Sequence, residues 1–149
     1  MDAQPVALIL PPAVYIKETG TPRGRGVFAG RAFKLDEVVE ACPVVLFDPL
    51  PTRQLPLDLK RIVFAWGKLL KLPYRRPAIV LGYGSLYNHS NPAGLRCEAD
   101  PTTCVLRLIA IRDIDADEEL TINYNAIESG VSSEDTWFKV NGVNLIADS

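Results

Sequence analysis

Short apolar stretches, separated by turn residues, recur along most of the chain. They are rich in valine, isoleucine and leucine and are bounded by proline, glycine or acidic turns, a pattern typical of β-strands. The pattern predicts strands at residues 6–10, 14–17, 37–47, 78–83, 104–111 and 120–124. In the last of these, Leu120, Ile122 and Tyr124 share one face because side chains alternate along a strand.

One segment shows the spacing of a helix instead. Apolar residues recur at three- and four-residue steps between residues 59 and 70. Asp58 is placed to cap the start of this run, and Pro73 ends it. We therefore predict one main helix whose apolar face packs on the core. Many short strands with a single helix indicate a mostly β fold.

The length and charge of the chain narrow the classes of function. It has 149 residues, of which 48% are hydrophobic, which suits one domain with a real core. Sixteen basic and eighteen acidic residues leave a net charge of -2, so we expect no direct nucleic-acid binding and no attraction to anionic lipid. No apolar run approaches the roughly 20 residues that span a bilayer. We expect a soluble cytoplasmic protein, or a nuclear one if its source is eukaryotic or viral.

The cysteines and the single histidine argue against a metal site. Cys42, Cys97 and Cys104 are odd in number, and no two have the two-residue spacing of zinc ligands. We expect reduced thiols in a reducing compartment. No second histidine exists to complete a histidine-based site with His89. No metal is therefore predicted.

Three local features are candidates for chemistry, although each has an ordinary structural interpretation. A lone histidine such as His89, in a polar loop, is usually structural or exposed. The Gly24-Arg25-Gly26 step does not open a helix, so it is no dinucleotide fingerprint, but glycine lets a backbone approach a ligand closely. Tyr124 ends a strand beside a loop, where a core or rim tyrosine is common. The order of these features along the chain is more informative than any one of them.

That order resembles the SET-domain family of protein-lysine methyltransferases, in its minimal single-domain bacterial or viral form. Residues 23–29 are similar to the family's first glycine motif, and residues 86–90 to its Asn-His-Ser motif. Residues 110–124 are similar to its acidic turn, strand and terminal tyrosine. The last two motifs are specific as a pair. The resemblance implies one SET domain over residues 1–149, with a catalytic core at about 14–138. It implies no cysteine-rich pre-SET or zinc-binding post-SET segment.

The resemblance also implies a fold, a cofactor and roles for particular residues. The fold would be a SET-type β-clip of several small sheets around a pseudoknot-like core. The cofactor would be S-adenosyl-L-methionine, and the catalytic residue, also in contact with the cofactor, would be Tyr124. The other cofactor-binding residues would be Gly24, Arg25, Gly26, Val27, Asn88, His89 and Trp137, the last lying over the adenine. Tyr87 and Phe138 would line the channel for the substrate lysine.

The implied reaction is methyl transfer to a lysine side-chain amine of a histone or another protein, and a homodimer is possible. An alternative is a catalytically weak SET-like module that binds protein or cofactor, and a third is a generic β-rich interaction domain. Intact Tyr124, Asn88 and His89 favour the enzyme. Ala41 and the missing post-SET segment favour the weak module. The family often has a tyrosine after the glutamate that is here Glu40.

Overall fold

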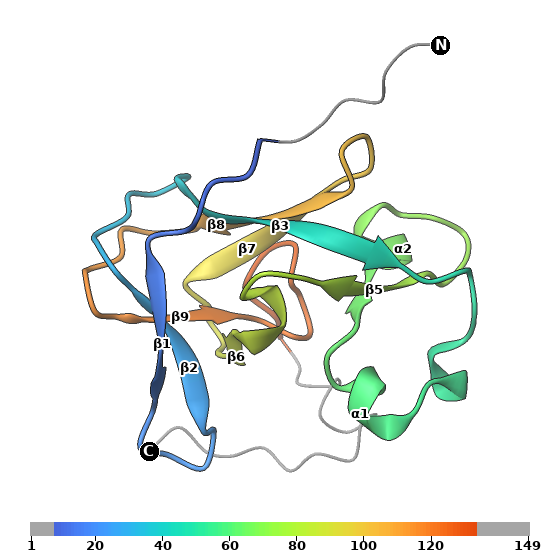
Figure 1. The fold of residues 1–149 in the computed structure, drawn as a ribbon, viewed down its shortest axis with the longest axis horizontal. Coiled ribbons are helices and arrows are strands. Elements are labelled where there is room, and N and C mark those ends of the chain that lie inside the picture. The colour runs from blue at the N-terminus through green and yellow to red at the C-terminus, as the bar shows by residue number, and fades with distance from the viewer. Residues whose placement is uncertain (1–7, 134–149) are drawn as a thin grey trace.

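The computed structural model describes residues 8–133, and Figure 1 shows two small sheets that meet at the centre of the molecule. Trp137 and Phe138 lie outside the described residues, so their predicted roles stay predictions. Residues 8–10 belong to no strand, which contradicts the described part of the predicted strand at 6–10.

The first sheet joins segments that are far apart in the sequence. Its order is β1-β2-β9-β6. The strands are β1 (Val14–Glu18), β2 (Arg25–Ala29), β9 (Glu119–Ile122) and β6 (Asn88–His89). β2 is antiparallel to both β1 and β9, whereas β6 runs parallel to β9, with Asn88 opposite Thr121 and His89 opposite Ile122. The glycine motif and the Asn-His-Ser motif therefore flank the same central strand.

The second sheet is larger and wholly antiparallel in its pairings. Its order is β4-β5-β3-β8-β7. The strands are β4 (Phe64–Ala65), β5 (Pro77–Val80), β3 (Val38–Leu46), β8 (Val105–Ala110) and β7 (Leu95–Asp100). The short helical turns are η1 (Thr52–Gln54), α1 (Leu57–Lys60), α2 (Trp66–Leu69) and η2 (Gly84–Leu86). The strands predicted at 14–17, 37–47, 78–83, 104–111 and 120–124 are confirmed, with small shifts at their ends.

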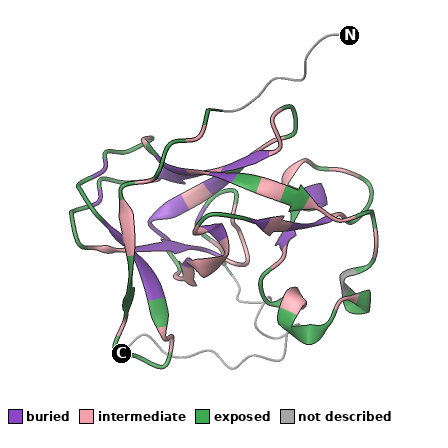
Figure 2. Cartoon of the chain, in the orientation of Figure 1, coloured by how far each residue is buried: buried purple, intermediate pink, exposed green. Residues whose placement is uncertain are grey.

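The core lies where the two sheets meet, as the buried strands in Figure 2 show. β8 and β9 are its centre. Leu120, Thr121, Ile122 and Asn123 are all buried, so β9 is covered on both faces and not on one alone. This burial fixes the position of the residues that follow β9.

The predicted helix at residues 59–70 is wrong. The structure has two single turns there, α1 and α2, separated by β4, which pairs with β5 through Phe64 and Ala65. A short isolated helix gains little because its first turn is costly to form, so pairing with a strand of the sheet prevails. The apolar residues of this segment therefore do not share one buried face: Trp66 is buried, whereas Ile62 is exposed. The fold is mostly β, as predicted, but without one main helix.

Candidate active site

Tyr124 lies in a turn immediately after β9, and the preceding residue holds that turn in place. Asn123 is fully buried, and its side-chain oxygen accepts a hydrogen bond from the backbone N–H of Asn125 at 2.9 Å. Its side-chain nitrogen donates to the hydroxyl of Ser132 at 3.0 Å. Because the buried strand and this turn both constrain the backbone, Tyr124 has a defined position.

The contacts of Tyr124 connect it to the Asn-His-Ser segment. Its backbone N–H donates to Nδ1 of His89 at 3.1 Å, and its hydroxyl donates to the backbone carbonyl of Tyr87 at 2.8 Å. The two rings of His89 and Tyr124 lie 5.3 Å apart. Since Nδ1 of His89 accepts a hydrogen bond, the proton of its neutral ring is on Nε2.

The hydroxyl of Tyr124 is neutral at physiological pH. Burial raises the pKa of Tyr124 to about 12, the positive charge of Arg23 opposes that rise, and the negative charge of Glu119 adds to it. Its proton is directed to the Tyr87 carbonyl, and a hydroxyl oxygen is also able to accept a hydrogen bond. Tyr124 can therefore orient a donor group but is poorly suited to remove a proton as a base.

The glycine motif is held against the Asn-His-Ser segment by polar side chains. The side-chain nitrogen of Asn88 donates to the carbonyl of Arg25 at 2.9 Å and to Oε1 of Glu119 at 2.8 Å. A Cβ at Gly26 would lie 2.5 Å from the same Oε1, so a larger residue there would displace this carboxylate from its present position. Arg23 donates to the carbonyl of His89 at 2.7 Å and lies 3.7 Å from Glu119. The predicted residues Gly24 to Val27, Asn88 and His89 are thus brought together.

A buried carboxylate supports Tyr87 from behind. Glu40, which is 4% exposed, accepts a hydrogen bond from the Tyr87 hydroxyl at 2.7 Å and one from the backbone N–H of Tyr83 at 3.0 Å. Burial, with the negative charge of Glu40 beside it, raises the pKa of Tyr87 well above its usual value. Glu40, Arg23 and Glu119 were not among the site residues predicted from the sequence. Arg23 lies within the glycine motif at residues 23–29, and Glu119 lies within the motif at residues 110–124. These two residues could therefore have been found from the motifs.

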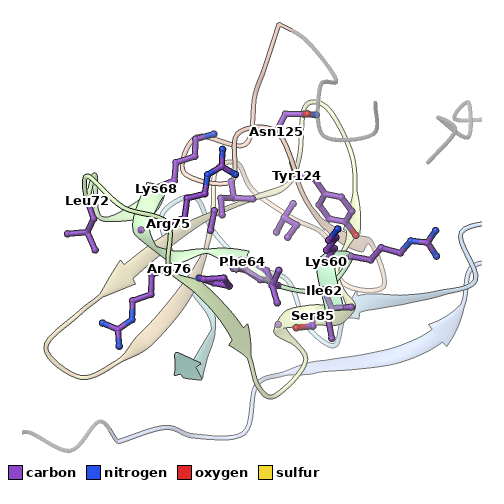
Figure 3. Close-up of a pocket in the computed structure, with 18 of the residues that line it drawn as sticks. Lys60, Ile62, Phe64, Lys68, Leu72, Arg75, Arg76, Ser85, Tyr124 and Asn125 are labelled. Carbon is purple, nitrogen blue, oxygen red and sulfur yellow. The ribbon is translucent and has the colours of Figure 1, made fainter. Parts of the chain in front are cut away.

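Tyr124 also lies in the wall of a cavity of about 700 Å³ (Figure 3). The lining of the cavity comes from residues 60–77, from the turn at 84–87, from the last residue of β9 and from the chain that follows β9. Tyr87 and Tyr124 both line it, whereas Gly24 to Val27, Asn88 and His89 do not. The channel role of Tyr87 stays a prediction. Tyr124 therefore belongs both to the cavity wall and to the polar cluster around the two motifs.

Among residues 8–133, no group of three or more His, Cys, Asp and Glu side chains is arranged to hold a metal ion. Within the same range, no helix is long and apolar enough to cross a bilayer. Cys42, Cys97 and Cys104 are free thiols.

Comparisons with known proteins identify the family. A family model described as the SET domain matches residues 24–125, which is more than half of the chain. A histone-lysine N-methyltransferase of Schizosaccharomyces pombe, specific for H3 lysine-37, is 26% identical over 104 residues, covering 68% of this chain and 67% of that protein.

Solved structures agree with the sequence comparisons. A protein of Plasmodium falciparum described as a candidate histone methyltransferase has a TM-score of 0.56 and 27% identity, over 74% of this chain and 96% of its own. The Cryptosporidium protein CpSET8 has a TM-score of 0.54 and 23% identity, over 76% of this chain and 57% of its own, and shows likeness of fold alone. With the matched family model spanning both motifs and Tyr124, the chain belongs to the SET-domain family of protein-lysine methyltransferases.

Proposed function

We propose that this chain is an S-adenosyl-L-methionine-dependent protein-lysine N-methyltransferase. The observation that carries the proposal is the position of Tyr124. Its neutral hydroxyl, fixed by the Tyr87 carbonyl, lies in the wall of a cavity and beside His89. A lysine entering the cavity would meet this hydroxyl where the two family motifs converge.

The residues around the glycine motif fit the cofactor. Gly24 has a φ of 74°, and a Cβ there would meet nothing within 4 Å, so its backbone is open to a ligand. The positive charge of Arg23 would attract the carboxylate of the cofactor, and Asn88 and His89 would offer polar groups to it. S-adenosylmethionine, when bound, supplies a methyl group that is already activated by the positive charge on sulfur. Gly24 to Val27, Asn88 and His89 would hold it.

The side chains of the cavity would prepare the lysine amine. A free lysine has a pKa of roughly 10.4, so it must lose its proton before it can attack a methyl group. Apolar residues of the lining, such as Phe64 and Ile122, disfavour the charged form by excluding water. The Tyr124 oxygen would accept an N–H of the neutral amine and align its lone pair. Positioning of this kind contributes roughly 7–11 kcal/mol in favourable intramolecular models.

Ala41 is one of the two features that favour the weak-module alternative, the other being the predicted lack of a post-SET segment. Ala41 lies in β3 opposite Arg107 and is not among the cavity residues. The possible homodimer stays a prediction.

The decisive experiment measures methyl transfer directly. The purified chain is incubated with labelled S-adenosylmethionine and either histones or a cell lysate, with Tyr124→Phe as the matched variant. We expect labelled protein with the wild type and much less with the variant. Calorimetry with S-adenosylmethionine should show binding of roughly micromolar affinity, about -8 kcal/mol, to both. Folded protein that neither binds this cofactor nor labels any protein would exclude the proposal.

A further inference from the structure

The cavity wall that faces Tyr124 carries charge of one sign. Six of the lining residues are basic, and none of the lining residues is Asp or Glu. We call these six residues the basic rim: Lys60, Arg61, Lys68, Lys71, Arg75 and Arg76. The segment from residue 59 to residue 76 has no acidic residue at all. Although the chain as a whole has a net charge of -2, the surroundings of the cavity are strongly positive.

The charges of the basic rim are not neutralised by carboxylates in the part of the chain that the structure describes. The ion pairs found among residues 8–133 involve other side chains. Arg76 donates one hydrogen bond, to the carbonyl of Phe47 at 3.1 Å. Arg61, Lys68, Lys71 and Arg75 are exposed, and Figure 3 shows the side chains of Lys68 and Arg75 at the cavity. The rim therefore presents positive charge to whatever enters.

A positive rim has two opposite effects on a lysine substrate. Like charges nearby disfavour the ammonium form, which helps to produce the neutral amine that the reaction needs. The same field repels a peptide whose lysine lies among other basic residues, since charges within a Debye length of roughly 8 Å still interact at physiological salt. Acidic residues beside the target lysine would be attracted by the rim and would steer the segment into the cavity.

We propose that the basic rim selects protein segments in which the target lysine is flanked by aspartate or glutamate. This inference rests on the proposed function and names its substrate class. The ligand chemistry follows from charge complementarity: carboxylates for the rim and one lysine for the cavity that ends at Tyr124. A basic segment, as in a lysine- and arginine-rich tail, fits this entrance poorly.

The test compares short peptides that differ only around one lysine. The first has runs of Asp and Glu on both sides, the second has Asn and Gln, and the third has Arg and Gln. Binding is measured by fluorescence anisotropy with the full chain, and methyl transfer by initial rates with labelled S-adenosylmethionine. We expect the acidic peptide to bind most tightly, to have the lowest KM, and to lose its advantage as salt increases.

Charge-neutralising variants locate the effect. Lys68→Gln combined with Arg75→Gln removes two charges from the rim, and should weaken binding of the acidic peptide by about twofold to twentyfold, on the usual strength of exposed ion pairs. Lys17→Gln combined with Lys34→Gln removes two exposed charges away from the cavity and should leave binding unchanged. Both double variants are at exposed positions, so folding is retained and thermal melting verifies it.

The outcomes separate the two proposals. Methyl transfer that is equal for the three peptides, or best with the basic one, would overturn the acidic-segment proposal while leaving the methyltransferase intact. Salt-sensitive binding of the acidic peptide that the rim variant alone loses would support it even if transfer were absent, and the proposed function would then fail by itself. A DNA oligonucleotide that binds the rim more tightly than the acidic peptide would also overturn it.

Discussion

Replacing the buried carboxylate of Glu40 should slow methyl transfer, although Glu40 does not line the cavity. Glu40 accepts hydrogen bonds from the Tyr87 hydroxyl at 2.7 Å and from the Tyr83 N–H at 3.0 Å. The carbonyl of the same Tyr87 accepts the hydroxyl of Tyr124 at 2.8 Å. Glu40 is therefore a positioning residue, which acts on Tyr124 through Tyr87.

The size of the expected loss follows from counting the hydrogen-bond donors and acceptors around Glu40. Glu40→Gln keeps the shape of the side chain but turns one of its two acceptors into a donor. With the amide oxygen toward Tyr83 N–H, the amide NH2 donates to the Tyr87 oxygen, and the Tyr87 proton loses its acceptor. A buried polar group left unsatisfied costs about 1–3 kcal/mol, and the remaining bond also loses its charged acceptor. We expect the free energy of unfolding to fall by about this amount. A shift of Tyr87 that lengthens its bond to Tyr124 should lower the rate of transfer about tenfold, or about 1.4 kcal/mol.

The assay combines denaturant unfolding with single-turnover transfer on the same preparation. Ile114→Val is the matched control, because this buried residue lies away from the cavity and its truncation costs about 0.5–1.5 kcal/mol. The control should lose stability and keep the transfer rate of its folded fraction. Cofactor affinity should remain near the wild-type value in both. If Glu40→Gln loses stability yet transfers methyl at the wild-type rate, the positioning role is refuted and Glu40 is only structural.

Tyr124→Phe should lower the free energy of unfolding by about 1 kcal/mol, because the hydrogen bond to Tyr87 is lost. It should slow single-turnover methyl transfer by roughly ten- to a thousandfold, or about 1.4–4 kcal/mol, with little change in cofactor affinity. An unchanged transfer rate would remove the hydroxyl from the mechanism. Burial raises the pKa of Cys97 to about 12 and that of Cys42 further. A thiol reagent at neutral pH should therefore label only Cys104 in the folded chain. Equal labelling of all three cysteines, detected by mass spectrometry, would contradict this prediction. The pKa of Tyr124 is higher in the folded chain than its unfolded value of about 10, so its contribution to stability is present below pH 10 and is lost as the pH rises through about 12. Urea unfolding at stepwise higher pH measures this loss. The Tyr124→Phe variant should lose less stability over the same pH range.

The sequence was most informative where a strand is both apolar and bounded by turn residues. The strands β3, β5, β8 and β9 were predicted from runs of this kind. β6 was not predicted, because two residues in a polar loop show no periodicity and form a strand only through pairing with β9. The helix error at 59–70 has the same origin: pairing of Phe64 and Ala65 with β5 is a tertiary contact, and local spacing does not reveal it.

The site was predicted in part for a similar reason. The order of Gly24, Asn88, His89 and Tyr124 along the chain was sufficient to group them through the family resemblance, and the structure brings these segments together on β9. Glu40 was not found, because its partners Tyr83 and Tyr87 are more than forty residues away in sequence. The basic rim was hidden as well, since the net charge of -2 averages over the whole chain and a local excess of one sign disappears from it.

The two sides of the site differ in how they are built, and this difference has a consequence for specificity. Tyr124 follows a strand buried on both faces and is fixed by His89 and Tyr87, so a change there disturbs the core together with the chemistry. The basic rim instead comes from single helical turns and the connections between them, and most of its side chains are exposed. Exposed substitutions usually change stability by less than about 0.5 kcal/mol. Substrate choice at the rim can therefore be altered without loss of the fold, whereas the residues that align the amine cannot be exchanged so freely.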